Sequence, residues 1–87
     1  MTLAFPNASR SLDEERGAIR FWGHQSQFEF TFYLDIEALQ RLSPQSGADE
    51  ASLLRVFDAN RGRIEAAAAL AHSRGRQSFY RLQASAF

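Results

Sequence analysis

The longest regular pattern of apolar positions lies in the second half of the chain, between Asp49 and Arg74. Its inward positions recur in alternating steps of four and three, the spacing of one face of a helix. They are Leu53, Phe57, Asn60, Ile64, Ala67 and Ala71. The acidic residues Asp49 and Glu50 suit the positive end of a helix, and Gly75 suits a left-handed C-terminal cap. The pattern predicts one continuous long helix.

A period of two replaces this pattern in the first half of the chain. Apolar side chains there alternate with polar or amphipathic ones, as half-buried strands require. The apolar positions are Ile19, Phe21, Phe28, Phe30, Phe32 and Leu34. If residues 23–26 form the connection, Phe21 lies opposite Phe28. Arg20 then faces Glu29, so hydrophobic and charged pairs agree in this register of an antiparallel hairpin.

Shorter patterns near the N-terminus predict two small elements. Leu3 and Phe5 precede Pro6, which suits a short edge strand that ends in a turn. The segment Ser11–Glu14 has the capping-box spacing of a hydroxyl and a carboxylate, and Gly17 follows it. This spacing predicts a single helical turn.

Two further elements are expected after the hairpin. Asp35 can cap a short helix over residues 36–42, which Ser43–Pro44 ends because the residue before proline avoids helical geometry. Near the C-terminus, Tyr80 and Leu82 share one face of a final strand.

Together these elements predict an α+β fold in a single domain, residues 1–87. A small antiparallel sheet, made of the hairpin 18–34 and the C-terminal strand 77–83, packs its phenylalanine face against one long helix and one short helix. An N-terminal edge strand is an optional member of this sheet.

The composition is typical of a folded domain and excludes sites that depend on cysteine. Hydrophobic residues make up 45% of the chain and charged residues 23%, which is ordinary for a soluble domain. Because there is no cysteine, neither a disulfide nor a thiolate metal site can form. No segment is apolar enough to span a membrane, and the N-terminus lacks a signal-peptide pattern, so we expect a cytoplasmic protein.

The net charge of zero conceals a difference between the two halves. Residues 1–50 hold four arginines against eight acidic residues, and residues 51–87 hold six against two, which gives −4 and +4. A basic half can indicate an anionic partner. Alternatively, the two halves attract each other across the fold.

Asn60 is the polar member of the inward helix face, and Asp58 and Arg61 flank it. A buried amide without a partner costs about 1–3 kcal/mol. Asn60 therefore either bonds within the protein and fixes the helix on the sheet, or contacts a ligand together with Asp58 and Arg61. Gly62, inside the helix, either allows close approach of another backbone or lies on the solvent face.

Arginines and histidines supply the other polar candidates. Arg74, Arg76 and Arg81 can bind phosphate, with nearby aromatic rings stacking on bases, or they can cap the helix C-terminus. His24 and His72 are far apart in sequence and belong to no metal-binding pattern. We therefore expect no metal and no cofactor.

The outer face of the hairpin is a candidate contact surface. Trp22 and Tyr33 are expected there together with Arg20 and Glu29, and His24 lies in the predicted turn beside Trp22. Aromatic and charged side chains on an uncovered sheet face suit a protein interface.

Four stretches resemble a known family in their order and spacing. They are Leu3–Asn7, Arg20–His24, Phe57–Arg61 with Arg63–Ile64, and Tyr80–Phe87. Over nearly its whole length the chain resembles the small bacterial proteins of domain-of-unknown-function family 1488. The resemblance implies a small bacterial cytoplasmic α+β protein and brings with it no activity, cofactor or catalytic residue.

Three classes of function remain. The sequence has no phosphate loop, nucleophile elbow or acid–base dyad, so we do not expect an enzyme, which would need a small-ligand pocket near Asp58, Asn60 and Arg61. A nucleic-acid-binding protein would need the basic residues on one exposed face. These are Arg61, Arg63, Arg74, Arg76 and Arg81. We favour a small non-enzymatic binding or regulatory module that acts through a protein partner or self-association.

Overall fold

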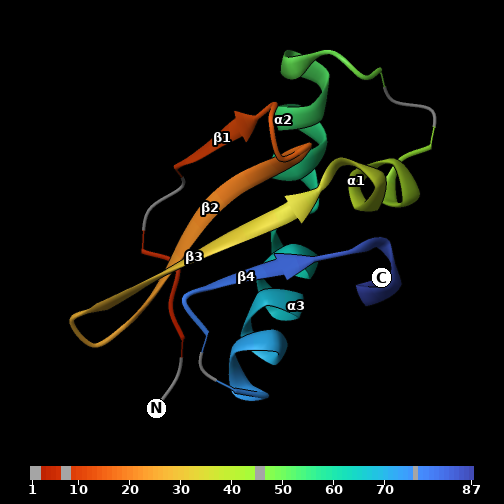
Figure 1. Ribbon diagram of the computed structural model, residues 1–87. Coiled ribbons are helices and arrows are strands. Elements are labelled where there is room, and N and C mark those ends of the chain that lie inside the picture. The colour runs from red at the N-terminus through yellow and green to blue at the C-terminus, as the bar shows by residue number, and fades with distance from the viewer. Residues whose placement is uncertain (1–2, 7–8, 45–46, 76) are drawn as a thin grey trace.

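The computed structural model describes residues 3–6, 9–44, 47–75 and 77–87, and within them it contains one sheet with helices on one face (Figure 1). The elements are β1 (Arg10–Asp13), β2 (Ala18–Gln25), β3 (Phe28–Asp35), α1 (Ile36–Leu42), α2 (Glu50–Ala59), α3 (Arg61–Ser73), β4 (Phe79–Leu82) and the 3-10 turn η1 (Ala84–Ala86). The strands lie in the order β1-β2-β3-β4. The α+β fold class is confirmed.

The central hairpin is present, but its register differs from the prediction by four residues. The turn consists of Ser26 and Gln27, with Ser26 in the left-handed region at φ 57°. Phe21 pairs with Phe32 instead of Phe28. Because the shift is an even number of residues, every side chain keeps its predicted face.

Gly23 explains the wrong register, because it lies inside β2 and not in the turn. A Cβ at this position would lie 3.0 Å from the Phe5 ring and 3.2 Å from the Leu3 side chain. Next to it, His24 exchanges two 2.7 Å backbone hydrogen bonds with Ala4. Glycine therefore lets the N-terminal segment pack on the strand. The predicted N-terminal strand is reduced here to one isolated bridge.

The edge strand beside the hairpin is β1, so the predicted helical turn over Ser11–Glu14 is wrong. β1 pairs antiparallel with β2, and residues 14–17 form the turn between them. The backbone N–H of Arg16 donates to the Asp13 carboxylate at 3.1 Å, and Gly17 adopts φ 59°. A carboxylate followed by a glycine serves a tight turn as well as a helix end, which is why the spacing misled.

β4 runs parallel to β3, so the sheet is mixed and not antiparallel as predicted. The chain passes between these strands through α1, α2 and α3, and a crossover of this kind brings the next strand back in the same direction. Tyr80 and Leu82 are buried on the helix side, as predicted.

The predicted long helix is two helices, α2 and α3, which meet at Asn60. Asn60 has φ −114° and ψ 18°, outside the helical region. Its side-chain amide donates to the Val56 carbonyl oxygen at 2.9 Å, and its backbone N–H donates to the carbonyls of Val56 and Phe57. The structural interpretation of Asn60 therefore applies: its amide is satisfied within the protein, at the point where one helix ends and the next begins.

The short helix α1 occupies its predicted range and ends at Ser43. Asp35 precedes it as expected, but the Asp35 carboxylate makes no capping hydrogen bond and instead pairs with Arg81 at 2.7 Å. The electrostatic partner on β4 replaces the cap because β4 lies directly beside β3.

The hydrophobic core lies between the sheet and the helices. Phe21 and Phe32 stack with their ring centroids 5.4 Å apart, and Phe21 meets Phe57 of α2 edge-on at 5.1 Å. Phe32 also stacks on Tyr80 of β4 at 5.0 Å. One aromatic cluster thus joins the hairpin of β2 and β3 to α2 and β4, which lie far from it in the sequence.

Candidate interaction surfaces

One face of the sheet is covered by no helix in the described part of the chain, and we call it the open face. Its side chains alternate along the strands with those of the core, so the strand register identifies them. They are Ser11 and Asp13 on β1, Ala18, Arg20, Trp22 and His24 on β2, Glu29, Thr31, Tyr33 and Asp35 on β3, and Phe79 and Arg81 on β4.

Three aromatic residues lie on the open face. Tyr33 is only 8% exposed, because the Phe79 ring meets it edge-on at 5.6 Å and the Arg16 guanidinium lies 4.9 Å above it. Phe79 itself is 49% exposed. Trp22 is half-buried beneath the Arg20 guanidinium at 5.5 Å. The sequence predicted Trp22 and Tyr33 on this face, and the structure adds Phe79 as a third aromatic residue.

The N-terminal segment leaves Trp22 uncovered in the described residues. Its Phe5 ring packs 6.1 Å from Phe21 and 6.0 Å from Phe32, both of which belong to the core side of the sheet. Leu3 is also buried in that core. Trp22, on the opposite side of β2, is therefore accessible to a partner.

The charges of the open face are mostly paired within the chain. Arg81 binds Asp35 and also donates to the Arg16 carbonyl oxygen at 2.7 Å. His24 lies in β2, not in the turn, and its Nε2 is 3.4 Å from the Glu29 carboxylate. The predicted Arg20–Glu29 pair is therefore wrong.

Arg20 faces Tyr33 on one neighbouring strand and Ser11 on the other. Arg20 Nε and Ser11 Oγ are both screened from solvent and have no hydrogen-bond partner within the described residues. A buried donor without an acceptor is costly. The hydrogen-bonding capacity of Arg20 Nε and Ser11 Oγ is not used within the described residues.

The predicted cluster of Asp58, Asn60 and Arg61 forms at the junction of α2 and α3. Arg10 of β1 donates to both Asp58 oxygens, at 3.0 and 2.8 Å, and Arg61 donates to the same carboxylate at 2.9 Å. The Arg10 hydrogen bond is the largest cause that lowers the pKa of Asp58, and it also raises the pKa of Arg10. Arg61 further lies 3.7 Å from Glu65.

This ion network connects β1 to α2 and α3. The charges of Asp58 and Arg61, which were predicted to contact a ligand, are paired within the chain. The residues of the network are not among those that line the two hollows described below. The pairing of Asp58 with Arg10 and Arg61 therefore supports a structural role for the junction.

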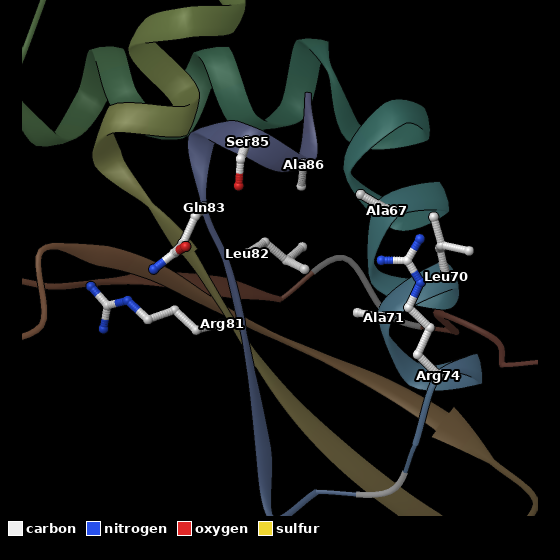
Figure 2. Close-up of a pocket in the computed structure, with 9 residues that line it drawn as sticks. All are labelled: Ala67, Leu70, Ala71, Arg74, Arg81, Leu82, Gln83, Ser85 and Ala86. Carbon is white, nitrogen blue, oxygen red and sulfur yellow. The ribbon is translucent and has the colours of Figure 1, made fainter.

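A groove of about 340 Å³ lies between α3 and the segment formed by β4 and η1 (Figure 2). It is lined by Ala67, Leu70, Ala71, Arg74, Arg81, Leu82, Gln83, Ser85 and Ala86. In Figure 2 the Leu82 side chain points toward α3, whereas Arg81 points to the opposite side of β4. A second hollow of about 320 Å³ lies between Gly17 and the start of α1.

The arginines proposed for nucleic-acid binding do not share one face. Arg61 belongs to the helix junction, Arg74 to the groove, and Arg81 to the open face. Arg63 is exposed near the start of α3, and Arg76 lies outside the described residues. The four candidate arginines that the structure describes therefore do not form one compact basic patch.

The two histidines lie on opposite sides of the sheet. His72 of α3 packs edge-on against Phe30 at 4.5 Å, on the helix side, whereas His24 is on the open face. Within the described ranges no three potential ligands among His, Cys, Asp and Glu gather in a metal-binding arrangement. Among the same residues no helix has the length and apolar character that crossing a membrane requires.

Comparisons with known proteins place this fold. A family model for proteins of unknown function, DUF1488, matches residues 3–83. The chain belongs to the DUF1488 family. The crystal structure of a DUF1488 protein of unknown function from Shewanella loihica PV-4 matches with a TM-score of 0.83 and 19% identity, over 93% of this chain and 91% of that one. At this identity the likeness shows the shared fold. The comparison with curated proteins gives no match.

The resemblance seen in the sequence is confirmed, and DUF1488 membership brings no activity to transfer. Sequence reasoning missed two features of this DUF1488 chain. Phe79 follows from the alternation that buries Tyr80 and Leu82, so the outward position was readable from the pattern. The groove beside Arg74 carried no signal, because its two walls are distant in sequence.

Proposed function

We propose that this DUF1488 chain is a small non-enzymatic protein-binding module and that the open face is its interface. One observation carries the proposal: Trp22, Tyr33 and Phe79 gather on a sheet face without a covering helix in the described residues. Arg20 stacks on Trp22 there. Trp, Tyr and Arg are the residue types most enriched at interface hot spots.

The charges of the open face support a protein partner over a nucleic acid. Arg20 and Arg81 are interspersed with Asp13, Glu29 and Asp35, so a polyanion would meet carboxylates wherever it met arginines. Interspersed charges of both signs can also complement a second copy of the same face around a two-fold axis. Self-association is therefore the first case to test.

Sedimentation of the purified chain at concentrations up to about 100 µM tests self-association. A dimer that dissociates on combining Trp22→Ala with Phe79→Ser supports the open face. The matched control is Phe28→Ser, since Phe28 is 52% exposed but its side chain belongs to the opposite side of β3 from Tyr33. A dimer that survives the double variant and is lost in the control contradicts the proposal.

If the chain is monomeric, a second protein is the partner. Immobilised wild-type, double-variant and Phe28→Ser chains are then compared on extracts of the source cell. A protein retained by the wild type and the control, but not by the double variant, supports the open face. Equal retention by all three chains contradicts it.

We also propose that the protein is bacterial and cytoplasmic, as the sequence led us to expect. The bacterial source of the structural neighbour supports the first part. Fractionation of the source cell, followed by detection of the native chain, tests the second.

A further inference from the structure

The groove beside β4 has a main-chain wall at the edge of the sheet. β4 is the last strand in the sheet order, so among the described residues no strand pairs with its outer side. Arg81 and Gln83 line the groove, yet in Figure 2 their side chains point to the opposite side of β4. Their contribution to this wall is therefore main chain. Unpaired main-chain groups at a sheet edge are what an added strand pairs with.

The opposite wall of the groove is apolar and comes from α3. Ala67 and Ala71 leave room because their side chains are short, and Leu70 is 54% exposed. Leu82 forms the floor, with its side chain directed at α3 in Figure 2. An apolar side chain of a ligand would be covered on two sides here.

Arg74 supplies the only charge directed into the groove from the residues that line it, because no acidic residue is among them and the Arg81 guanidinium binds Asp35. The Arg74 side chain forms no ion pair or side-chain hydrogen bond with the described residues. Its guanidinium lies beside Leu70 in Figure 2. The groove thus presents a free cation next to an apolar wall, which is complementary to a carboxylate on an otherwise apolar segment.

The distance between the apolar side chain of Leu70 and the charge of Arg74 matches the spacing of side chains in an extended chain. Leu70 and Arg74 are one helical turn apart, about 6 Å along α3 at about 1.5 Å per residue. In a strand, residues two positions apart point to the same side and are separated by about 6.6 Å. An added strand that runs along α3 at this point therefore places one side chain against Leu70 and the next on the same side against Arg74.

We propose that this groove binds an extended segment of a partner protein as an added strand beside β4. The segment carries an acidic residue that pairs with Arg74 and an apolar residue, two positions away, that packs on Leu70. A volume of about 340 Å³ is at the lower end for ligand sites, which suits a short segment. This site goes beyond the open face, because the two surfaces lie on opposite sides of β4.

The test uses amide chemical shifts of the labelled full chain during titration with capped peptides. The peptides consist of threonine and valine, with one leucine and one glutamate two positions apart, in both orders. We expect binding with a Kd between about 0.1 and 1 mM and shifts confined to β4, η1 and α3. The same peptides methylated on backbone nitrogen should not bind, because a strand needs main-chain pairing.

Two substitutions, one in α3 and one at its C-terminal cap, form a matched pair. Arg74→Gln should weaken peptide binding about tenfold. Replacing the peptide glutamate by glutamine should weaken binding to the wild-type chain by the same factor. It should change binding to Arg74→Gln very little, because the ion pair is already lost there. Arg63→Gln removes the same charge near the opposite end of α3, about 16 Å away along the helix axis, and should leave the affinity unchanged. Both side chains are exposed, so neither change should unfold the chain.

Four results would overturn the peptide site. They are no shifts with either peptide at about 1 mM, equal weakening by Arg63→Gln, undiminished binding of the methylated peptides, and groove shifts with octanoate but not with peptide. Trp22→Ala should leave peptide binding unchanged. The experiments can therefore contradict the peptide site without contradicting the open face as an interface, and the reverse.

Discussion

Phe21 and Phe32 on the covered face of the sheet are sequence neighbours of Trp22 and Tyr33 on the open face. The two phenylalanines are almost fully buried, stack on each other, and contact rings from α2 and β4. Trp22 and Tyr33 instead pack under guanidinium groups. The difference is the helix layer, which covers one face with apolar groups. The other face is shielded by two guanidinium groups and by the exposed Phe79 ring, which a partner can displace.

The largest expected effect is a difference in the free energy of unfolding between two variants, each of which removes one aromatic ring from one face of the sheet. Phe32→Ala should lower the free energy of unfolding by about 3–5 kcal/mol, because it opens a cavity in the sealed layer. Trp22→Ala should cost less than about 1.5 kcal/mol, since the ring is half-buried beside solvent. Urea unfolding of both variants measures the difference.

The variant Phe32→Leu serves if Phe32→Ala does not fold, and it should still cost more than Trp22→Ala. Equal losses on the two faces would mean that the open face is as tightly packed as the core. The comparison between the faces would then be wrong.

Gly23→Ala tests how closely the N-terminal segment packs on the covered face. The new methyl group would meet the Phe5 and Leu3 side chains at 3.0 and 3.2 Å, so we expect a loss of about 1–2 kcal/mol in urea unfolding. Phe5→Leu, which shortens the closest neighbour, should reduce the additional cost of Gly23→Ala in a double-mutant cycle. Additive losses would indicate that the segment does not contact the strand in solution.

The Arg10–Asp58 pair joins β1 to α2 and makes the covered side sensitive to acid. The folded-state pKa of Asp58 is below its ordinary value of 3.8, so its stabilisation is present above about pH 4 and is lost as the pH falls through the folded-state pKa. The side chain is 44% exposed, so the effect should be about 1 kcal/mol or less. Urea unfolding at pH 6 and at pH 3 measures it.

Arg10→Gln should be less stable than the wild type at pH 6 and should lose less on acidification. Some acid sensitivity will remain, because hydrogen bonds from Ser52 also lower the pKa of Asp49 at the start of α2. Arg63→Gln is the control and should retain the wild-type response. Identical acid responses of the wild type and Arg10→Gln would show that this pair does not form in solution.

The smallest expected effect is an increase in the free energy of unfolding. Gly62 lies on the solvent side of α3, where an added Cβ would meet no atom within 4 Å. Gly62→Ala should therefore stabilise the chain by about 0.5 kcal/mol, because it restricts the unfolded chain without a new contact. A loss of stability in thermal unfolding would mean that this part of the helix layer is less open than the structure indicates.

The expectations for the interaction surfaces had a mixed outcome. Alternation of residue types placed Trp22 and Tyr33 on the outer face, and the same rule applied to β4 would have added Phe79. It could not reveal that Arg20 stacks on Trp22 or that Arg16 covers Tyr33, because those contacts depend on rotamers and on the turn after β1. The groove was invisible because its walls, α3 and β4 with η1, meet only in three dimensions.

The sequence by itself determined the α+β class, the family, the short helix and the face on which each hairpin side chain lies. These follow from local periodicity, which survives even a four-residue shift of register. Tertiary structure decided the rest. The register depends on Gly23 accepting the N-terminal segment, and the parallel pairing of β4 depends on the helical crossover. The break at Asn60 depends on an amide that satisfies a carbonyl of the preceding turn. In each case distant or alternative partners compete for the same backbone groups, and only the packed chain selects among them.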